Sequence, residues 1–339
     1  EYQTALPEVR EEIDTAVATA RRRFEPTARF DYSGILAAKM KMLRTLFDAR
    51  DPVSTSSDEM TAFLRANQWI KPYAIFRALK SQNEERPWSQ WTGERDIDAA
   101  GIARLWKRRD LIAETRFYAW VQLRLSQQFT TVAEELDEMG VALKGDIPIL
   151  MNEDSADAWY DRDIFRPELR AGAPPDMFSA LGQNWGFPIY NWERLGERNY
   201  DWWRNRLKSA ARYYHAYRID PVLGFFRIWA VPAGNYSGIP GFFWPQHGIS
   251  GEEWHNAGFD EDRITWLREP HITGAQLREN LAEAAADLIG PVFQQLNGED
   301  LFRFSPEISG EQELADLEKQ SADLTAQWQA EKDKLNKSQ

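Results

Sequence analysis

The stretch that decides the fold of this chain is Ala211-Arg-Tyr-Tyr-His-Ala-Tyr-Arg-Ile-Asp-Pro-Val-Leu-Gly-Phe-Phe-Arg-Ile-Trp229. An amphipathic helical pattern runs here into a short extended step, and Gly224 then turns the chain away. Side chains alternate along a strand, so Arg218 and Asp220 point to the same face. A neighbouring guanidinium keeps a carboxylate ionised, as a covalent nucleophile requires. A structural ion pair is the alternative interpretation of these two residues.

An earlier segment repeats the arrangement of a helix followed by a strand. Residues 111–139 carry apolar side chains near helical spacing and are followed by Gly140, which predicts a long helix. The apolar run Val141–Met151 has the length of a strand, and Pro148 predicts that its pairing ends there. Asp146 then lies near the carboxyl end of a buried strand. Two such units predict a β/α architecture with acidic residues at one edge.

The remaining segments are less regular. Residues 152–192 are too long and too polar for a simple connection, and we interpret them as an ordered functional loop. Residues 191–215 return to a helical pattern. Residues 232–258 are rich in glycine, proline and aromatic residues and indicate loops or short turns. Farther on, Thr273 is a candidate cap for a helix that extends to Leu288.

Both ends of the chain have helical patterns. Residues 1–110 indicate a helical region, and Pro72 within the aromatic-rich segment Phe63–Lys80 predicts two short helices or a kink. From Leu314 onward, apolar residues recur at spacings of three and four, as in a short coiled coil. A solvent-facing helical arm is an equally good interpretation. The residues of this spacing are Leu317, Leu324, Trp328 and Leu335.

Composition excludes several classes of protein. The net charge of -12, from 41 basic and 53 acidic residues, argues against nucleic acid or an anionic membrane as the main partner. Cysteine is absent, which excludes disulfides and thiolate metal sites. Without a signal peptide or an apolar run of roughly 20 residues, we expect a cytoplasmic protein. The chain begins at Glu1 rather than methionine, and we interpret it as a fragment or a processed chain.

Several common motifs are missing. The four histidines show no metal-ligand spacing, and Gly182 and Gly186 do not form a phosphate-binding loop, so no metal or cofactor is expected. A Gly-x-Ser-x-Gly motif is not found. What remains is a set of carboxylates, arginine and aromatic side chains, including 15 tryptophans. These groups suit a carbohydrate site, although aromatic residues also fill large cores.

Five segments in order resemble one family, the amylomaltases, which are 4-α-glucanotransferases of glycoside hydrolase family 77. The segment Trp69–Lys80 also resembles this family, and the sequence after Gly224 is most similar to its plant-type disproportionating-enzyme-2 branch. The resemblance implies transfer of α-1,4-glucan segments between maltodextrins, in starch or glycogen metabolism, by a retaining mechanism. The five segments are Gly145–Ile149, Asp154–Trp159, Gly172–Ser179, Gly182–Pro188 and Arg218–Asp220.

The resemblance also implies a fold and a set of roles. The fold is part of a (β/α)8 barrel of the α-amylase clan with an inserted helical subdomain. Asp220 is the implied nucleophile, Arg218 keeps its carboxylate ionised, and Asp146 supports the site. The segment from Pro174 to Ser179 is the implied loop over the bound glucan. The implied substrate-binding residues are Arg218, Asp146, Asp154, Asp176, Phe178, Gln183 and Trp185.

On this basis we expect four regions. Residues 1–110 form the helical subdomain, and 111–232 form the barrel segment with the third and fourth strands and the covering loop. Residues 233–305 form a loop-rich and helical insertion. Residues 306–339 form a coiled-coil-like helix, through which a homodimer is a possible assembly.

The chain departs from the family pattern in specific places. Pro221 replaces the usual histidine after the nucleophile, and Met177 replaces a tyrosine in the covering loop. No segment matches the family's general-acid glutamate. The resemblance therefore implies that this chain is an internal piece of a longer enzyme, and we expect it to be inactive by itself. Two alternatives to the transferase remain: an α-glucan hydrolase, and a non-catalytic glucan-binding or scaffold protein.

Overall fold

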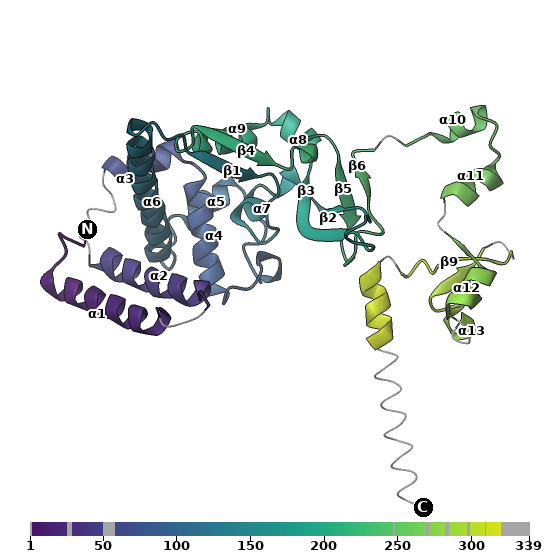
Figure 1. Cartoon of the computed structure of the whole chain (residues 1–339), viewed down its shortest axis with the longest axis horizontal. Helices are drawn as coiled ribbons and strands as arrows, with labels where there is room; N and C mark the ends of the chain where they lie inside the picture. Colours follow the sequence, from purple (N-terminus) through teal and green to yellow (C-terminus); the bar gives the residue numbers. More distant parts are fainter. Residues whose placement is uncertain are drawn as a thin grey trace, which may run out of the picture. The chain divides into compact units, whose positions relative to one another are not determined.

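The computed structural model gives a mixed α/β chain that divides into two compact units (Figure 1). Unit 1 comprises Glu1–Phe165 and Tyr190–Asp220, and unit 2 comprises Arg166–Ile189 and Pro221–Gln339. The mixed α/β class agrees with the prediction. The described strands form separate sheets of two, four and three strands, and none of these sheets closes into a barrel. The structure describes residues 2–25, 29–49, 58–246, 248–268, 271–281, 285–296, 299–308 and 310–319.

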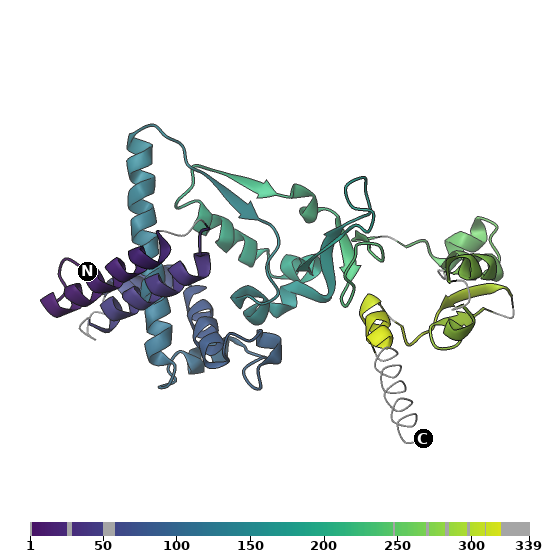
Figure 2. The ribbon, with the colours of Figure 1, turned by 60° about the horizontal axis from the view of Figure 1, so that its bottom comes forward.

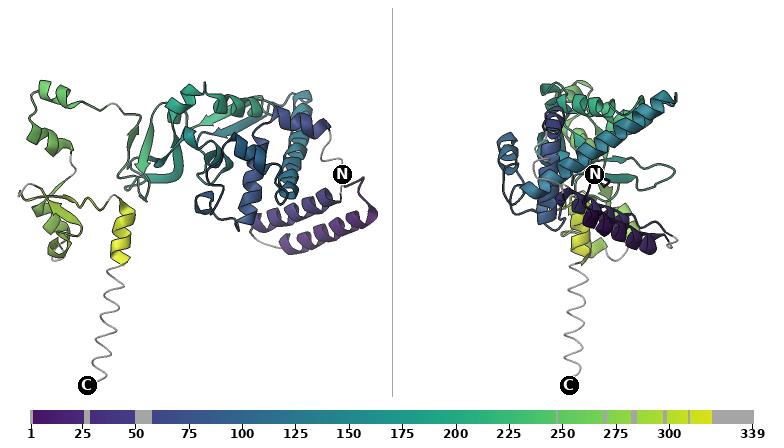
Figure 3. Two further views of the ribbon diagram at one scale, coloured as in Figure 1. Left: turned by 180° about the vertical axis from the view of Figure 1, so that it is seen from behind. Right: turned by 90° about the vertical axis from the view of Figure 1, so that its left-hand side faces the viewer.

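Unit 1 contains helices and one pair of parallel strands, β1 and β4 (Figure 2). The first two helices, α1 and α2, pack side by side (Figure 3). Its helices are α1 (Pro7–Phe24), α2 (Tyr32–Asp48), α3 (Asp58–Ala66), α4 (Ile70–Gln82), η2 (Trp88–Gln90), α5 (Ala99–Leu105), α6 (Ile112–Glu138), α7 (Ala156–Tyr160), η3 (Arg162–Ile164), α8 (Trp192–Glu197) and α9 (Asp201–Ala210), and its strands are β1 (Lys144–Pro148) and β4 (Ala216–Asp220).

Helix α6 confirms the long helix predicted from the apolar spacing of residues 111–139, and it ends just before Gly140, as predicted. Gly140 has a φ of +70°, a left-handed conformation that glycine adopts without steric cost. The N–H of Gly140 donates to the carbonyl of Asp137 at 2.9 Å, and that of Val141 donates to Leu136 at 2.8 Å. This pair of bonds satisfies the last carbonyls of the helix and directs the chain into β1.

The aromatic-rich segment forms two helices, as predicted, but Pro72 is not the point of interruption. The break lies between Ala66 and Ile70, and Pro72 falls in the first turn of α4, where its missing N–H costs nothing. The buried side chain of Asn67 stabilises the break, because its amide donates to the carbonyl of Phe63 at 2.9 Å. Its amide oxygen accepts a bond from Arg212 at 2.7 Å.

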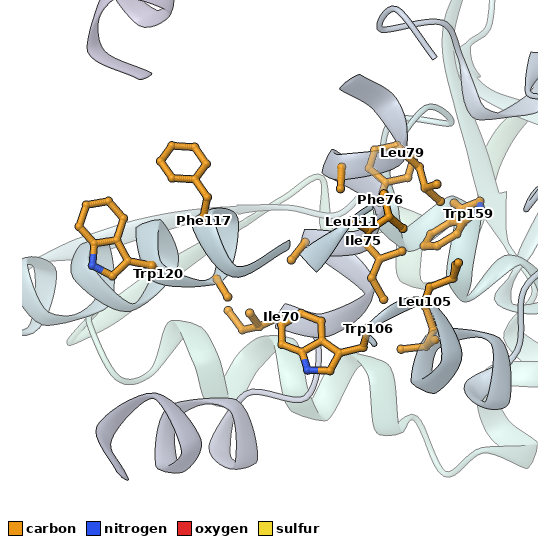
Figure 4. Close-up of a cluster of buried hydrophobic side chains, with 14 of the residues drawn as sticks. Ile70, Ile75, Phe76, Leu79, Leu105, Trp106, Leu111, Phe117, Trp120 and Trp159 are labelled. Carbon is orange, nitrogen blue, oxygen red and sulfur yellow. The ribbon is translucent and has the colours of Figure 1, made fainter. Parts of the chain in front are cut away.

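Many of the tryptophans fill the core of unit 1. Phe76, Trp91 and Trp159 form a mutual cluster with ring centroids 5.6 to 6.1 Å apart, and Figure 4 shows Phe76 beside Trp159. The two indole N–H groups are satisfied, since Trp91 donates to the carbonyl of Arg86 and Trp159 to that of Glu94. For these residues the core interpretation of the aromatic content is therefore correct.

Unit 2 contains the strands that the sequence interpretation missed. The segment 152–192, expected to be a loop, includes α7 and the neighbouring strands β2 (Phe165–Ala173) and β3 (Gln183–Tyr190). The segment 232–258 includes the short strand β6 (Phe242–Trp244) and the helix α10 (Gly251–Asn256), so the expectation of loops alone was wrong. With β5 (Ile228–Pro232), these strands form one sheet in the order β3-β2-β5-β6.

The rest of unit 2 is a small three-stranded sheet with short helices. Thr273 is confirmed as a helix cap, because its hydroxyl accepts the N–H of Gln276 at 3.2 Å. The sheet order is β7-β9-β8. The elements are α11 (Glu261–Arg268), β7 (Ile272–Thr273), α12 (Gly274–Leu281), α13 (Ala285–Leu288), β8 (Phe293–Gln295) and β9 (Leu301–Phe304).

The described chain ends in a helical segment over residues 311–319. Leu324, Trp328 and Leu335 of the predicted coiled-coil pattern lie outside the described residues, so this prediction stays open. Within the described part of the chain, every helix is too short or too polar to cross a membrane.

Candidate active site

The candidate site lies on the two parallel strands of unit 1. In their register, Asp146 of β1 is opposite Arg218 of β4, and Pro148 is opposite Asp220. The two predicted helix–strand units are confirmed, and the β1 pairing ends at Pro148 as predicted. Asp146 is the central residue of its strand, two positions before the end.

Strand alternation explains why the charged groups share a face. Ile147 and Ile219 occupy the opposite, more buried face of the pair. Asp146, Arg218 and Asp220 therefore project together from the exposed face. Their side chains are 54%, 59% and 60% exposed.

Arg218 lies between the two carboxylates, but it binds them unequally. Its Nε donates to Asp146 Oδ1 at 3.1 Å and its Nη2 to Asp146 Oδ2 at 2.6 Å, a two-pronged contact with one carboxylate. The same Nη2 reaches Asp220 Oδ2 at 3.3 Å. The sequence interpretation paired Arg218 with Asp220 alone, and it therefore missed the closer partner across the strand pair.

The electrostatics of the site follow from these bonds. The hydrogen bond from Arg218 lowers the pKa of Asp146 below its ordinary value, and the positive charge of Arg218 acts in the same direction. The bond to Asp146 in turn raises the pKa of the Arg218 guanidinium. Asp146 and Arg218 thus form an ionised pair, and the carboxylate of Asp220 lies beside it.

Asp154, a predicted substrate-binding residue, has partners inside the protein. Its Oδ2 pairs with Lys80 Nζ at 2.5 Å, and its Oδ1 accepts the N–H of Trp88 at 3.1 Å. Lys80 is buried and also donates to the carbonyls of Glu85 and Arg86. The sequence interpretation gave Lys80 no role. Its position one helical turn after the buried Phe76 is the signal that indicates an inward-facing lysine.

The other predicted residues lie in unit 2, in and around the connection between β2 and β3. Asp176 stabilises this connection, because its Oδ1 accepts the N–H groups of Phe178 and Ser179, both at 2.8 Å. The side chains at its tip are exposed: Met177 is 90% and Phe178 87% accessible. In β3, the indole N–H of Trp185 donates a hydrogen bond to Oε1 of Gln183 at 2.8 Å.

Glycine closes the base of this connection. Gly182 has a φ of +63°, and a Cβ at this position would lie 2.6 Å from the carbonyl oxygen of Ala173. Only glycine fits both the conformation and the close approach of the two chain segments. The predicted covering segment is therefore an ordered connection between two strands.

No three acidic or histidine side chains among the described residues are grouped as ligands for a metal ion. Unit 1 thus holds two carboxylates and one guanidinium, and unit 2 holds a set of exposed aromatic and amide groups of its own.

Sequence comparison adds the decisive observation. The family profile described as 4-alpha-glucanotransferase, of glycoside hydrolase family 77, matches residues 3–334. The chain belongs to this family. The resemblance found from the five sequence segments is thereby confirmed.

Individual 4-alpha-glucanotransferases match parts of the chain. The rice enzyme 4-alpha-glucanotransferase DPE2 (Oryza sativa subsp. japonica) is 38% identical over 252 residues, which cover 74% of this chain and 26% of the relative. The Thermus thermophilus enzyme is 32% identical over 228 residues, covering 64% and 45%. The chain thus spans about a quarter to a half of the length of these curated relatives.

Solved amylomaltase structures have a similar fold. Amylomaltase from Streptococcus agalactiae, in complex with acarbose, aligns with a TM-score of 0.59 and 22% identity, over 75% of this chain and 57% of that one. Amylomaltase from Corynebacterium glutamicum aligns with a TM-score of 0.59 and 24% identity, over 71% and 32%.

Proposed function

We propose that this chain carries the nucleophile of a 4-α-glucanotransferase that transfers α-1,4-glucan segments between maltodextrins. The observation that carries the proposal is the placement of Arg218 between Asp146 and Asp220 on two adjacent parallel strands. Membership of the 4-alpha-glucanotransferase family supports it. An arginine that binds one carboxylate through two hydrogen bonds is fixed in orientation. Its positive charge can then also stabilise the second carboxylate.

In the proposed reaction, an oxygen of Asp220 attacks the anomeric carbon of the donor glucan. The bond from that carbon to the leaving oxygen breaks, and the leaving oxygen takes a proton from a general acid. The 4-hydroxyl of an acceptor glucan then attacks the same carbon and gives its proton back to that acid. The Asp220 carboxylate is released unchanged. We assign no residue of this chain as the general acid. The complete reaction therefore needs an acidic group other than Asp146 and Asp220.

We propose that β1 and β4 are the third and fourth strands of a (β/α)8 barrel. Their parallel pairing, each after a helix, supports this assignment. Residues 1–110 are then the inserted helical subdomain, and 111–232, 233–305 and 306–339 are the barrel segment, the insertion and the coiled-coil-like helix. A homodimer through that last helix stays a prediction.

For the substrate, we propose that the β2–β3 connection covers a bound glucan. The exposed rings of Phe178 and Trp185 offer faces for stacking on sugars, and Asp176 and Gln183 offer a carboxylate and an amide group to sugar hydroxyls. Both carboxylate oxygens of Asp154 already have protein partners. We therefore propose that Asp154 positions neighbouring residues and does not contact the glucan directly.

Transfer and hydrolysis can be separated with the full-length protein and maltotriose. Transfer gives glucose together with maltodextrins longer than maltotriose, because a second glucan accepts the segment. Hydrolysis gives only glucose and maltose. Absence of longer products at high maltotriose concentration would exclude the transferase and favour the hydrolase. A protein that binds maltotriose without converting it would favour the non-catalytic alternative.

Asp220→Asn tests the nucleophile in the same full-length protein. The amide cannot form the covalent glucosyl ester, so we expect turnover to fall by at least about a thousandfold and covalent trapping to disappear, with the fold retained. Asp48→Asn, which changes an exposed carboxylate at the end of α2, is the matched control and should keep full activity. Substantial transfer by Asp220→Asn removes Asp220 from this role.

A further inference from the structure

Unit 1 contains a cavity of about 1090 Å³ that the proposed reaction does not use. It lies among α3, α4, α5, α7 and α9, with one residue from α6, and every residue that lines it belongs to unit 1. Its volume is slightly above the range of about 300 to 1,000 Å³ that is typical of small-molecule sites. Asp146, Arg218 and Asp220 are not among the lining residues.

The charge of the cavity is opposite to that of the protein. Five cationic and three carboxylate side chains line it, a local balance of +2 in a chain whose net charge is -12. Part of this charge is neutralised internally, because Arg198 pairs with Asp161 at 2.8 Å and with Asp201 at 3.3 Å. A cavity of positive potential on an acidic protein favours an anionic ligand.

The remaining cations are Arg65, Lys71, Arg116 and Arg206. Within the part of the chain that the structure describes, none of the four forms an ion pair. Instead, two of them face the indole of Trp106: the Arg116 guanidinium carbon is 4.1 Å and Lys71 Nζ 5.9 Å from the ring centroid. Burial lowers the pKa of Arg116, which is the effect expected for a partly desolvated cation without a counter-ion.

The α7–α9 side of the cavity offers different chemistry. Asp157 accepts the indole N–H of Trp202 at 3.1 Å and lines the cavity. Nη1 of Arg206 is buried and has no hydrogen-bond partner among the described residues. An acceptor and a donor of this kind suit the hydroxyl groups of a sugar. The 44% exposed ring of Trp69, on α4's side, adds an aromatic face.

We propose that this cavity binds a phosphorylated sugar. The phosphate, with roughly -1.5 to -2 charge at neutral pH, lies against Arg65, Lys71 and Arg116, which supply charge-assisted hydrogen bonds. The sugar hydroxyls point toward Asp157 and Arg206. This site is separate from the glucan-transfer chemistry and does not depend on the proposed function.

Isothermal titration calorimetry tests whether the cavity binds a phosphorylated sugar. The protein is titrated separately with glucose 6-phosphate, inorganic phosphate and glucose. Glucose 6-phosphate should bind at least about tenfold more tightly than either of the other two, because only it uses both sides of the cavity. Lys71→Met and Arg116→Gln should each weaken its binding about tenfold, the loss of one charge-assisted bond.

Matched controls separate this site from folding and from the transfer reaction. Arg109→Gln, which changes an exposed arginine outside the cavity, should leave the affinity unchanged, and so should Asp220→Asn. Thermal unfolding checks each variant. If Arg116→Gln does not fold, Arg65→Gln replaces it, since Arg65 is exposed on α3. Equal affinity for inorganic phosphate, no binding of glucose 6-phosphate, or undiminished binding by the folded cation variants would each overturn the assignment.

Discussion

At the scale of single residues, the most informative contact is the one between Arg218 and Asp146. The tripeptide Arg218–Asp220 suggests a local pair, because its two charged side chains share a face. The structure shows that the shorter bonds cross to the neighbouring strand, at 2.6 and 3.1 Å, against 3.3 Å within the strand. Side chains directly opposite in a strand pair approach closely, whereas residues i and i+2 are farther apart along the chain.

This geometry makes a prediction about Asp146. In Arg218→Met, the pKa of Asp146 should rise toward its ordinary value of 3.8, because the main cause of its lowering is removed. The shift can be followed by carbon-13 NMR titration of the carboxyl group. Because the folded-state pKa is lowered, the stability that this pair contributes is present above the ordinary pKa and is lost as the pH falls through the lowered value.

Lys144→Met is the control for this titration. Lys144 also lowers the pKa of Asp146, but only as the weakest of the causes, so its removal should shift the pKa less than the removal of Arg218 does. An unchanged pKa in Arg218→Met, or a larger shift in Lys144→Met, contradicts the assignment of Arg218 as the main partner.

At the scale of elements, the ion pair between Lys80 and Asp154 joins helix α4 to the segment that follows β1. The Lys80 side chain is 9% and the Asp154 side chain 26% exposed, so both charges are largely removed from water. Each is hydrogen-bonded further, Lys80 to two carbonyls and Asp154 to one backbone N–H. Such a contact fixes the start of α7 relative to α4 within unit 1.

Lys80→Met should therefore destabilise the protein strongly. It leaves the Asp154 carboxylate without its cation, and we expect a loss of about 3 kcal/mol in the free energy of unfolding, at the lower end of values for a broken buried pair, because Asp154 is partly exposed. Chemical denaturation measures this loss. Arg86→Met breaks the exposed pair with Glu84 and should change stability little.

The double variant Lys80→Met with Asp154→Asn supplies the critical comparison. The amide no longer carries a charge, so the double variant should recover part of the lost stability. A double variant that is less stable by the full sum of the two single changes would show that the charges do not interact.

Some elements of the structure cannot be predicted from the local sequence pattern alone. Helix α6 and strands β1 and β4 follow directly from periodicity. Strands β2 and β3 do not, because β2 contains Pro167 and Gly172 and β3 contains Gly186 and Pro188, residues with low strand propensity. The two strands lie side by side in one sheet. Pairing between segments, rather than local preference, therefore determines their conformation.

At the scale of the whole molecule, the dominant property is its acidity. With a net charge of -12 at pH 7 and an isoelectric point near 5.0, the molecules repel one another at neutral pH. Solubility should pass through a minimum near pH 5, where carboxylates gain protons and the net charge vanishes.

Solubility measured between pH 4 and pH 8 checks this expectation. Added salt is the control, because it screens repulsion between exposed charges and should reduce the difference between pH 5 and pH 7. A protein that is equally soluble at both pH values, at low salt, contradicts a charge-controlled solubility.

The sequence by itself determined the local elements and the family: a helix leading to a strand, twice, with acidic residues on both strands. These depend on periodicity and on motifs within short segments. Only the tertiary structure decided which partners the charges have. Lys80 lies 74 positions from Asp154, and Arg218 lies 72 positions from Asp146. It also decided that four cations without carboxylate partners among the described residues line one cavity. Such contacts depend on strand register and helix packing, which no local pattern specifies.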